Sequence, residues 1–430
     1  MSEQSDRQLE RRETDPLRVI IRVAELLFVH GETTEGTRRT VERLGGGLGT
    51  RVTFVPRWGD LRILPDRCTF GAEVAAEPLG VDMARVNATE LLVDKLCDHK
   101  SSPRAALSQL DDIARLPAVG LSRFVAMAAA GAAALSVIFG ATDFSTIGWT
   151  AVSAGVGAGI RRLLSLVSRN PFVQPFAAAL VAGAIVSLLS SAHLAISQHL
   201  VAACPCMVLV PGPHFLNGAI DLVRARIALG AARVLFASLV IVAICAGLLI
   251  GLSFGPTRLD APVTSVQVPF FYDLCAAGVA VAAYGAFFNM PWRMLPAPIA
   301  IGVSAHALRW LVLDAGASMQ LGALAGCTLA GLSSALLSRR LRVPFGAIAF
   351  AAVVSLIPGI FMFQTAADAL SIVNSGPGVP VSDLYEIASN VVKVSVTLLA
   401  MATGLIVPKM LFDGWLLLSR NGDRRHGAPS

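Results

Sequence analysis

Apolar stretches of about twenty residues follow one another from residue 121 almost to the end of the chain. A helix needs about 20 mostly apolar residues to cross the hydrocarbon core of a bilayer. The pattern therefore predicts ten membrane-spanning helices, at about 121–141, 144–160, 172–196, 199–220, 234–254, 270–290, 295–313, 318–338, 345–370 and 386–408.

The first 120 residues follow a different pattern, with shorter apolar runs and many more polar positions. Apolar residues at helical spacing predict an amphipathic helix over 16–30, which Gly31 ends. Thr33 or Thr34 would cap a second helix, and the three glycines at 45–47 would stop it. This segment is predicted to be a small α/β domain, with strands at 51–56 and 61–64 and further helices at 82–98 and 103–116.

The overall composition is that of a membrane protein. Hydrophobic residues make up 54% of the chain and charged residues 15%, and the mean hydropathy is +0.66. Soluble proteins are about 25% charged, so these values exclude a soluble enzyme of two or three domains. They also exclude a disordered chain, which would be far less apolar. The chain starts with polar residues instead of an apolar signal segment, so we expect the first 120 residues to stay in the cytoplasm.

The formal net charge of +6 would suggest nucleic-acid binding in a soluble protein, but the positions of the charges give another explanation. After residue 120, 18 Lys and Arg stand against 10 Asp and Glu. With a cytoplasmic N-terminus, the external loops hold only Arg258, and the other basic residues considered fall on the cytoplasmic side, as the positive-inside rule requires. The charges therefore support ten spans with both termini in the cytoplasm, and we expect no nucleic-acid partner. The cytoplasmic set is Arg161, Arg162, Arg169, Arg224, Arg226, Arg233, Arg293, Arg339, Arg340, Arg342, Lys409, Arg420, Arg424 and Arg425.

The fourth and ninth predicted spans resemble each other. LVPGPHFLNGAIDL begins at residue 209 and LIPGIFMFQTAADA at residue 356, an offset of 147, and five of the 14 positions are identical. Nearly the same offset relates GAGIRRLL at 157–164 to AHALRWLV at 305–312. Five spans are an odd number, so a second set of five would cross the membrane in the opposite sense. Inverted repeats of this kind are typical of secondary transporters.

The predicted fold is an all-α polytopic membrane protein with ten transmembrane helices in an inverted 5+5 repeat, preceded by a small N-terminal α/β cytoplasmic domain. The expected divisions are a cytoplasmic domain at 1–120, a first five-helix repeat at 121–254, a linker at 255–269, a second five-helix repeat at 270–412 and a cytoplasmic tail at 413–430.

The repeated Pro-Gly pairs are the first candidate site. Proline and glycine interrupt helices, and inside a membrane such breaks are tolerated where they face protein or a water-filled cavity. Two half-helices that begin at these breaks would direct their positive N-termini at one pocket, which suits a carboxylate ligand. A pair of kinks that only shapes packing is the alternative. The candidate substrate-binding residues are Pro211, Gly212, His214, Asn217, Pro358, Gly359 and Gln364.

Ionisable residues within the spans form a second candidate set, because such residues commonly carry protons or charge-paired ligands. The candidates for proton coupling or charge pairing are Asp221, Asp368, His306 and Lys393. Each has a structural alternative. Asp221 could pair with Arg224 or Arg226 at the cytoplasmic interface, His306 could be a hydrogen-bonded core residue, and Lys393 could extend to the interface. Asp273 is expected in the interface, and neither a catalytic set, a metal site nor a cofactor is predicted.

The segment PGPHFLNGAIDLVRARIALGAAR resembles the threonine/serine exporter family, with matching residues Pro211, Gly212, Asn217, Asp221, Gly230 and Arg233. HGETTEGTRRTVERLGG near the N-terminus and LIPG at 356–359 are similar to further motifs of that family, so the resemblance covers roughly 16–412. It implies export of small amino acids, threonine and serine, driven by the proton-motive force, from a bacterial cell (inner) membrane. It also implies that both membrane halves are fused here in one chain.

The expected partners are the amino-acid substrate, protons and the lipid bilayer, and homo-oligomerisation stays open. Two other classes of protein are alternatives. A membrane receptor or scaffold would use the N-terminal domain as its output module. A membrane-embedded enzyme is disfavoured because the spans hold no pairing of a nucleophile with a base, so a non-enzyme is expected.

Overall fold

The computed structural model describes residues 16–66, 71–194, 196–255, 268–341, 343–359, 361–365, 368, 372 and 381–426, and in the last helix it describes side chains as far as residue 412. Most of the predicted linker at 255–269 and the side chains of the predicted tail at 413–430 therefore lie outside the described residues.

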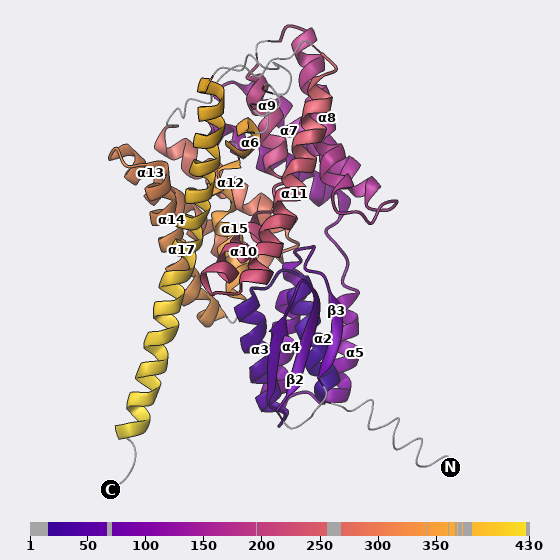
Figure 1. The fold of residues 1–430 in the computed structure, drawn as a ribbon, viewed down its shortest axis with the longest axis vertical. Helices are drawn as coiled ribbons and strands as arrows, with labels where there is room; N and C mark the ends of the chain where they lie inside the picture. The colour runs from indigo at the N-terminus through magenta and orange to yellow at the C-terminus, as the bar shows by residue number, and fades with distance from the viewer. Residues whose placement is uncertain are drawn as a thin grey trace.

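Residues 16–114 combine a three-stranded antiparallel sheet with four helices. The sheet order is β1-β2-β3, and Leu61 and Ile63 of β2 are fully buried in a hydrophobic core that these helices share. This segment lies at one end of the helical remainder, where Figure 1 shows it in indigo and violet. Its elements are α2 (Pro16–Val29), α3 (Thr34–Gly47), β1 (Val52–Pro56), β2 (Gly59–Pro65), β3 (Ala72–Ala76), α4 (Met83–Cys97) and α5 (Pro103–Ala114).

Local signals predicted the start of α3 and placed its end to within a few residues. Gly31 adopts a φ of +92° after α2, and the Thr33 side chain caps α3 by accepting from the Gly36 amide at 3.0 Å. The three glycines form the last residues of α3, which stops at the third of them, Gly47, and not before the first. A Cβ at Gly45 would lie 2.6 Å from the carbonyl oxygen of Thr50, so this glycine permits the close turn into β1.

The remainder of the described chain is helical (Figure 1). Its elements are α6 (Leu121–Ile138), α7 (Phe144–Leu164), α8 (Val173–Ser191), α9 (Gln198–Met207), α10 (Gly212–Val223), α11 (Ile227–Leu252), α12 (Phe270–Phe287), η1 (Trp292–Met294), α13 (Pro296–Asp314), α14 (Met319–Leu341), α15 (Phe345–Val353), η2 (Val354–Leu356) and α17 (Val381–His426).

Seven helices in the described part of the chain are long and apolar enough to cross a membrane, and the bent pair α9–α10 makes up to eight. The protein is thus a largely helical polytopic membrane protein. The Arg-bearing helix α7 and the short helix α15 occupy two further predicted spans without meeting the same criterion of length and hydropathy. The ten spans and the inverted repeat stay predictions.

Small residues bring the helices together at two corresponding places. A Cβ at Gly251 of α11 would overlap the carbonyl oxygen of Leu180 on α8. On the other side of the bundle, a Cβ at Gly331 of α14 would lie 2.6 Å from the carbonyl oxygen of Leu405 on α17. In a membrane, where helices gain little from the hydrophobic effect, this backbone proximity is a main source of packing energy.

Candidate functional site

The first Pro-Gly pair breaks a helix, as predicted. α9 ends at Met207, α10 begins at Gly212, and the two helices are bent by 60° at the break. Pro211 precedes the first residue of α10, and Pro213 occupies its first turn, where the missing amide would have no intrahelical partner anyway. The N-terminus of α10 is therefore directed into the bundle.

The second Pro-Gly pair also interrupts a helix. α15 tightens into the short 3-10 helix η2, Ile357 and Pro358 are not helical, and helical backbone resumes at Gly359. Proline at 358 cannot donate the hydrogen bond that would continue the helix from η2. Both repeated motifs thus form breaks, and part of the segment that follows the second one lies outside the described residues.

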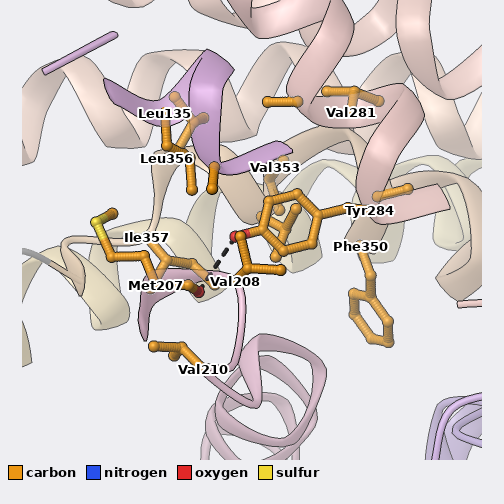
Figure 2. Close-up of a cluster of buried hydrophobic side chains, with 14 of the residues drawn as sticks. Leu135, Met207, Val208, Val210, Val281, Tyr284, Phe350, Val353, Leu356 and Ile357 are labelled. Carbon is orange, nitrogen blue, oxygen red and sulfur yellow. Dashed lines mark hydrogen bonds between the residues drawn. The ribbon is translucent and has the colours of Figure 1, made fainter. Parts of the chain in front are cut away.

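The two breaks contact each other in the centre of the bundle. A Cβ at Gly212 would lie 2.6 Å from Cδ1 of Ile357, and a Cβ at Gly359 would lie 3.0 Å from Cγ of Met207. Figure 2 shows Met207 and Ile357 in one apolar cluster, with the Tyr284 hydroxyl donating to the Met207 carbonyl at 3.2 Å. The space enclosed here is about 10 Å³, too small for an amino acid, so the breaks are packed shut in this conformation.

The predicted substrate-binding residues are only partly gathered at this point. Pro211, Gly212, Pro358 and Gly359 lie at the two breaks. The three polar candidates lie apart from this apolar contact. The Asn217 amide donates to the carbonyl of Gly31 at 3.4 Å, His214 lies edge-on to Phe236 with ring centroids 5.1 Å apart, and Gln364 is half-buried beyond the second break.

Asp221 is fully buried where α10 meets the N-terminal segment. It accepts a hydrogen bond from the Thr34 hydroxyl at 2.9 Å and forms ion pairs with Arg226 at 3.3 Å and Arg233 at 3.4 Å. Arg233 is itself 1% exposed, and its guanidinium lies 5.2 Å from the ring centroid of Phe28 in α2. The ion pair with Arg226 that the structural alternative for Asp221 expected is thus present, and its place at the cytoplasmic interface stays a prediction.

Glu35 extends this charged cluster. Its carboxylate lies 3.0 Å from Arg224 and 2.9 Å from Arg226. Burial by itself would raise the pKa of Glu35, but hydrogen bonds from Arg38, Arg226 and Arg39 outweigh burial and hold the pKa well below its usual range. Glu35 is therefore ionised at any physiological pH, and we name the set Thr34, Glu35, Asp221, Arg224, Arg226 and Arg233 the docking cluster.

Sequence reasoning missed Thr34 and Glu35 as partners of α10. The two contacts join residues 187 and 191 positions apart in the chain. No local pattern encodes such a pair. The available signal was that both residues lie in the HGETTEG segment, which carries part of the family resemblance.

A second buried polar group lies in the other half of the bundle. Nδ1 of His306 is 3.2 Å from Oδ2 of Asp273, and Nε2 of His306 is 2.9 Å from Oγ of Ser355. The three side chains are between 0% and 4% exposed. Asp273 lies in the first turn of α12, where α13 and its histidine cover it, and its expected place at the membrane interface stays a prediction. We name these residues the histidine chain.

The remaining ionisable candidates lie outside both groups. Lys393 is exposed on α17, with its Nζ 5.7 Å from the ring centroid of Phe361. Asp368 is half-buried on the segment that follows the second break. Ser355 joins the set as a residue that sequence reasoning overlooked, because a lone serine in an apolar span gives no signal of its own.

Two family comparisons cover nearly the whole chain. A family model described as a threonine/serine exporter matches residues 18–255. A second model, also described as a threonine/serine exporter, matches residues 273–411. No solved structure matches the chain.

Proposed function

Since the chain belongs to the threonine/serine exporter family, we propose that it exports threonine and serine from the cytoplasm in exchange for protons. The family supports amino-acid export by a membrane protein. The observation that carries the mechanism is the contact between two helix breaks of repeated sequence at the centre of the bundle. Broken helices at such a centre are where secondary transporters bind their substrates.

The arrangement of helices supports an inverted repeat of five helices each. The starts of α6 and α12 are 149 residues apart, and those of α9 and α15 are 147 apart, close to the offset of the repeated motifs. Corresponding helices also pack alike, since α8 lies along α11 as α14 lies along α17. In this assignment α9 and α10 form one broken span, and α15 with the segment from Gly359 forms the other.

The position of the N-terminal segment supports its cytoplasmic location. Its residues contact the loops that the positive-inside rule assigns to the cytoplasm. Glu35 pairs with Arg224 and Arg226, and the Met83 amide donates to the carbonyl of Phe288 at 2.8 Å. All of these loops would therefore lie at one end of the bundle, the end that faces the cytoplasm.

In the proposed cycle the substrate carboxylate binds at the half-helix N-termini that begin at Gly212 and Gly359. The N-terminal ends of half-helices carry partial positive charge, which attracts a carboxylate. In the closed conformation the Gly212 and Gly359 amides donate to the carbonyls of Val210 and Ile357 at 2.8 Å, so opening of the breaks must free them for the substrate. Asn217 and Gln364, at the same spacing after each break, would bind the side-chain hydroxyl. Since the breaks are packed shut in this conformation, one repeat must rock against the other to open the pocket.

The histidine chain is the proposed proton site. Ser355 belongs to η2 and lies three residues before Pro358, so a change in the protonation of His306 reaches the second break through one hydrogen bond. A histidine that gains a proton must donate from both ring nitrogens, which strengthens its bond to Asp273 and requires the Ser355 oxygen to accept. The proton thereby favours one conformation of the break.

Flux measurements test the proposal. Purified protein in liposomes should move labelled threonine and serine when a pH gradient is imposed, and a panel of other amino acids defines the range of substrates. His306→Gln should keep exchange of labelled for unlabelled threonine but lose its acceleration by the gradient. Absence of any amino-acid flux in the unmodified protein contradicts the proposed function, and an unchanged gradient response in His306→Gln contradicts only the proton site.

A further inference from the structure

A cavity lies between the N-terminal segment and the second half of the bundle. Its volume is about 510 Å³, and its walls come from α3 and α4 on one side and from α14, α15 and α17 on the other. Small-molecule sites commonly occupy roughly 300–1,000 Å³ and occur preferentially at domain boundaries. The cavity is separate from the two helix breaks.

Glu32 lines this cavity with an unsatisfied carboxylate. The residue is 2% exposed, its Oε1 accepts from the Thr33 hydroxyl at 2.9 Å, and its Oε2 has no hydrogen-bond partner among the described residues. A Cβ at Gly36 would overlap Oε1, so a larger residue there would displace the carboxylate from its observed position. A buried carboxylate oxygen without a partner is costly, and a ligand that donates to it would remove the cost.

The other acidic side chains of the α3–α4 wall already have partners. Glu90 accepts from the Thr40 hydroxyl at 2.6 Å, and Arg43 forms ion pairs with both Glu90 and Asp94, the latter at 2.7 Å. Glu32 is thus a lining residue of the cavity with a carboxylate oxygen that has no hydrogen-bond partner among the described residues. Among the described residues no cluster of three His, Cys, Asp or Glu side chains fits a metal ion, which favours an organic cation.

The opposite wall supplies positive charge. Arg339 from the end of α14 and Lys409 from α17 both line the cavity, and Nζ of Lys409 lies 4.5 Å from the ring centroid of Phe345 at the start of α15. A ligand that spans the cavity therefore meets a carboxylate on one wall and cationic groups on the other. An α-amino acid, with its ammonium and carboxylate groups, has this pattern of charge.

We propose that this cavity binds a small α-amino acid on the cytoplasmic side, with the ammonium group against Glu32 and the carboxylate toward Lys409 and Arg339. The inference rests on the proposed export function and adds a loading site that is distinct from the helix breaks. α15 begins at the cavity and leads to the second break, so a ligand bound here lies at the cytoplasmic end of a broken span.

Protons would compete with the ligand for Glu32. Burial, with a contribution from the charge of Glu90, raises the pKa of Glu32 to about 7, and the hydrogen bond from Thr33 and the charge of Lys409 offset part of the rise. Arg39 and Arg43 also line the cavity from α3, and both are held in ion pairs with acidic residues. Because an ammonium group needs the ionised carboxylate, affinity should fall as pH drops below about 7.

Direct binding of labelled threonine to the purified full-length protein tests the site. Glu32→Gln should weaken binding by at least tenfold at pH 8 and should remove the loss of affinity that the unmodified protein shows between pH 8 and pH 6. Glu42→Gln is the matched control, because Glu42 lies on α3, pairs with Arg38 and is not part of the cavity wall. Its affinity should equal that of the unmodified protein.

A second variant separates loss of the site from loss of the fold. Ser338→Trp fills the cavity from α14 and leaves Glu32 in place, so it should also abolish this binding while the protein elutes and melts like the unmodified chain. Unchanged threonine affinity in both Glu32→Gln and Ser338→Trp overturns the loading site. If threonine flux persists in those variants, the export function does not depend on the loading site. If the unmodified protein moves no amino acid, the proposed export function itself is contradicted.

Discussion

Replacing Asp221 by asparagine should detach the N-terminal segment, residues 16–114, from the membrane helices. Asp221 is the acidic partner of Arg233 in the docking cluster, with a separation of 3.4 Å, and both side chains are at most 2% exposed. The Nε and Nη1 atoms of Arg233 have no hydrogen-bond partner among the described residues. The variant therefore leaves a buried guanidinium with little compensation.

The expected cost is about 3–5 kcal/mol, the usual penalty for removing one partner of a buried ion pair. Undocking relieves this cost, because the Arg233 guanidinium lies over the ring of Phe28 in the N-terminal segment and becomes hydrated when that segment leaves. Since about 1.4 kcal/mol corresponds to a factor of ten, the undocked population should rise by roughly 100-fold or more.

Limited proteolysis of the connection between α5 and α6 measures the undocked population, provided that undocking and redocking are fast relative to cleavage. Asp221→Asn should be cleaved there much faster, and Asp314→Asn, at an exposed position at the end of α13, should behave like the unmodified protein. The double variant Asp221→Asn with Arg233→Leu removes both charges, so its cleavage rate should return most of the way to that of the unmodified protein. Cleavage of Asp221→Asn within twofold of the unmodified rate would refute this account of the docking cluster.

Two further predictions concern stability. The pKa of Glu32 is raised from 4.5 to about 7 in the folded protein, so its contribution to stability is present below pH 4.5 and lost as pH rises toward 7. The free energy of unfolding of Glu32→Gln should therefore exceed that of the unmodified protein by roughly 3 kcal/mol at pH 8 and should equal it at pH 4. Melting temperatures of the two proteins between pH 4 and pH 8 test this prediction. A difference in melting temperature that becomes smaller as pH rises would contradict it. Gly251→Val should lower the melting temperature in detergent, because its side chain would overlap the backbone of Leu180 and Ala184, whereas Gly148→Val enters open space. Equal melting temperatures of the two glycine variants would show that α8 and α11 are not in close contact.

Features that depend on local chemistry could be predicted from the sequence. Proline and glycine break helices wherever they occur together in an apolar span, so both breaks were found at the residues where the structure has them. The cap at Thr33 and the start of the half-helix at Gly212 follow from the same kind of local signal. Family membership was predicted from the residues that surround the first break, and the comparisons confirm it.

Features that depend on tertiary contact could not be predicted. Asp273 is near the start of its span in sequence, but its burial depends on His306, 33 residues away on the next helix. The three glycines at 45–47 have low helix propensity but belong to α3, and the close approach of Thr50 to Gly45 is a contact that the local sequence does not reveal. Strand β3 has the sequence AEVAA, which has no strong strand signal, and pairing with β2 determines it.

The proton movement that accompanies threonine flux tests the central claim most directly. Liposomes containing the purified protein and a trapped pH-sensitive dye receive a threonine gradient with no initial pH difference. The account predicts that threonine moving in one direction drives protons in the other, and that serine does the same. Threonine flux with no change in the dye would contradict proton exchange, and no flux of either amino acid would contradict the function itself.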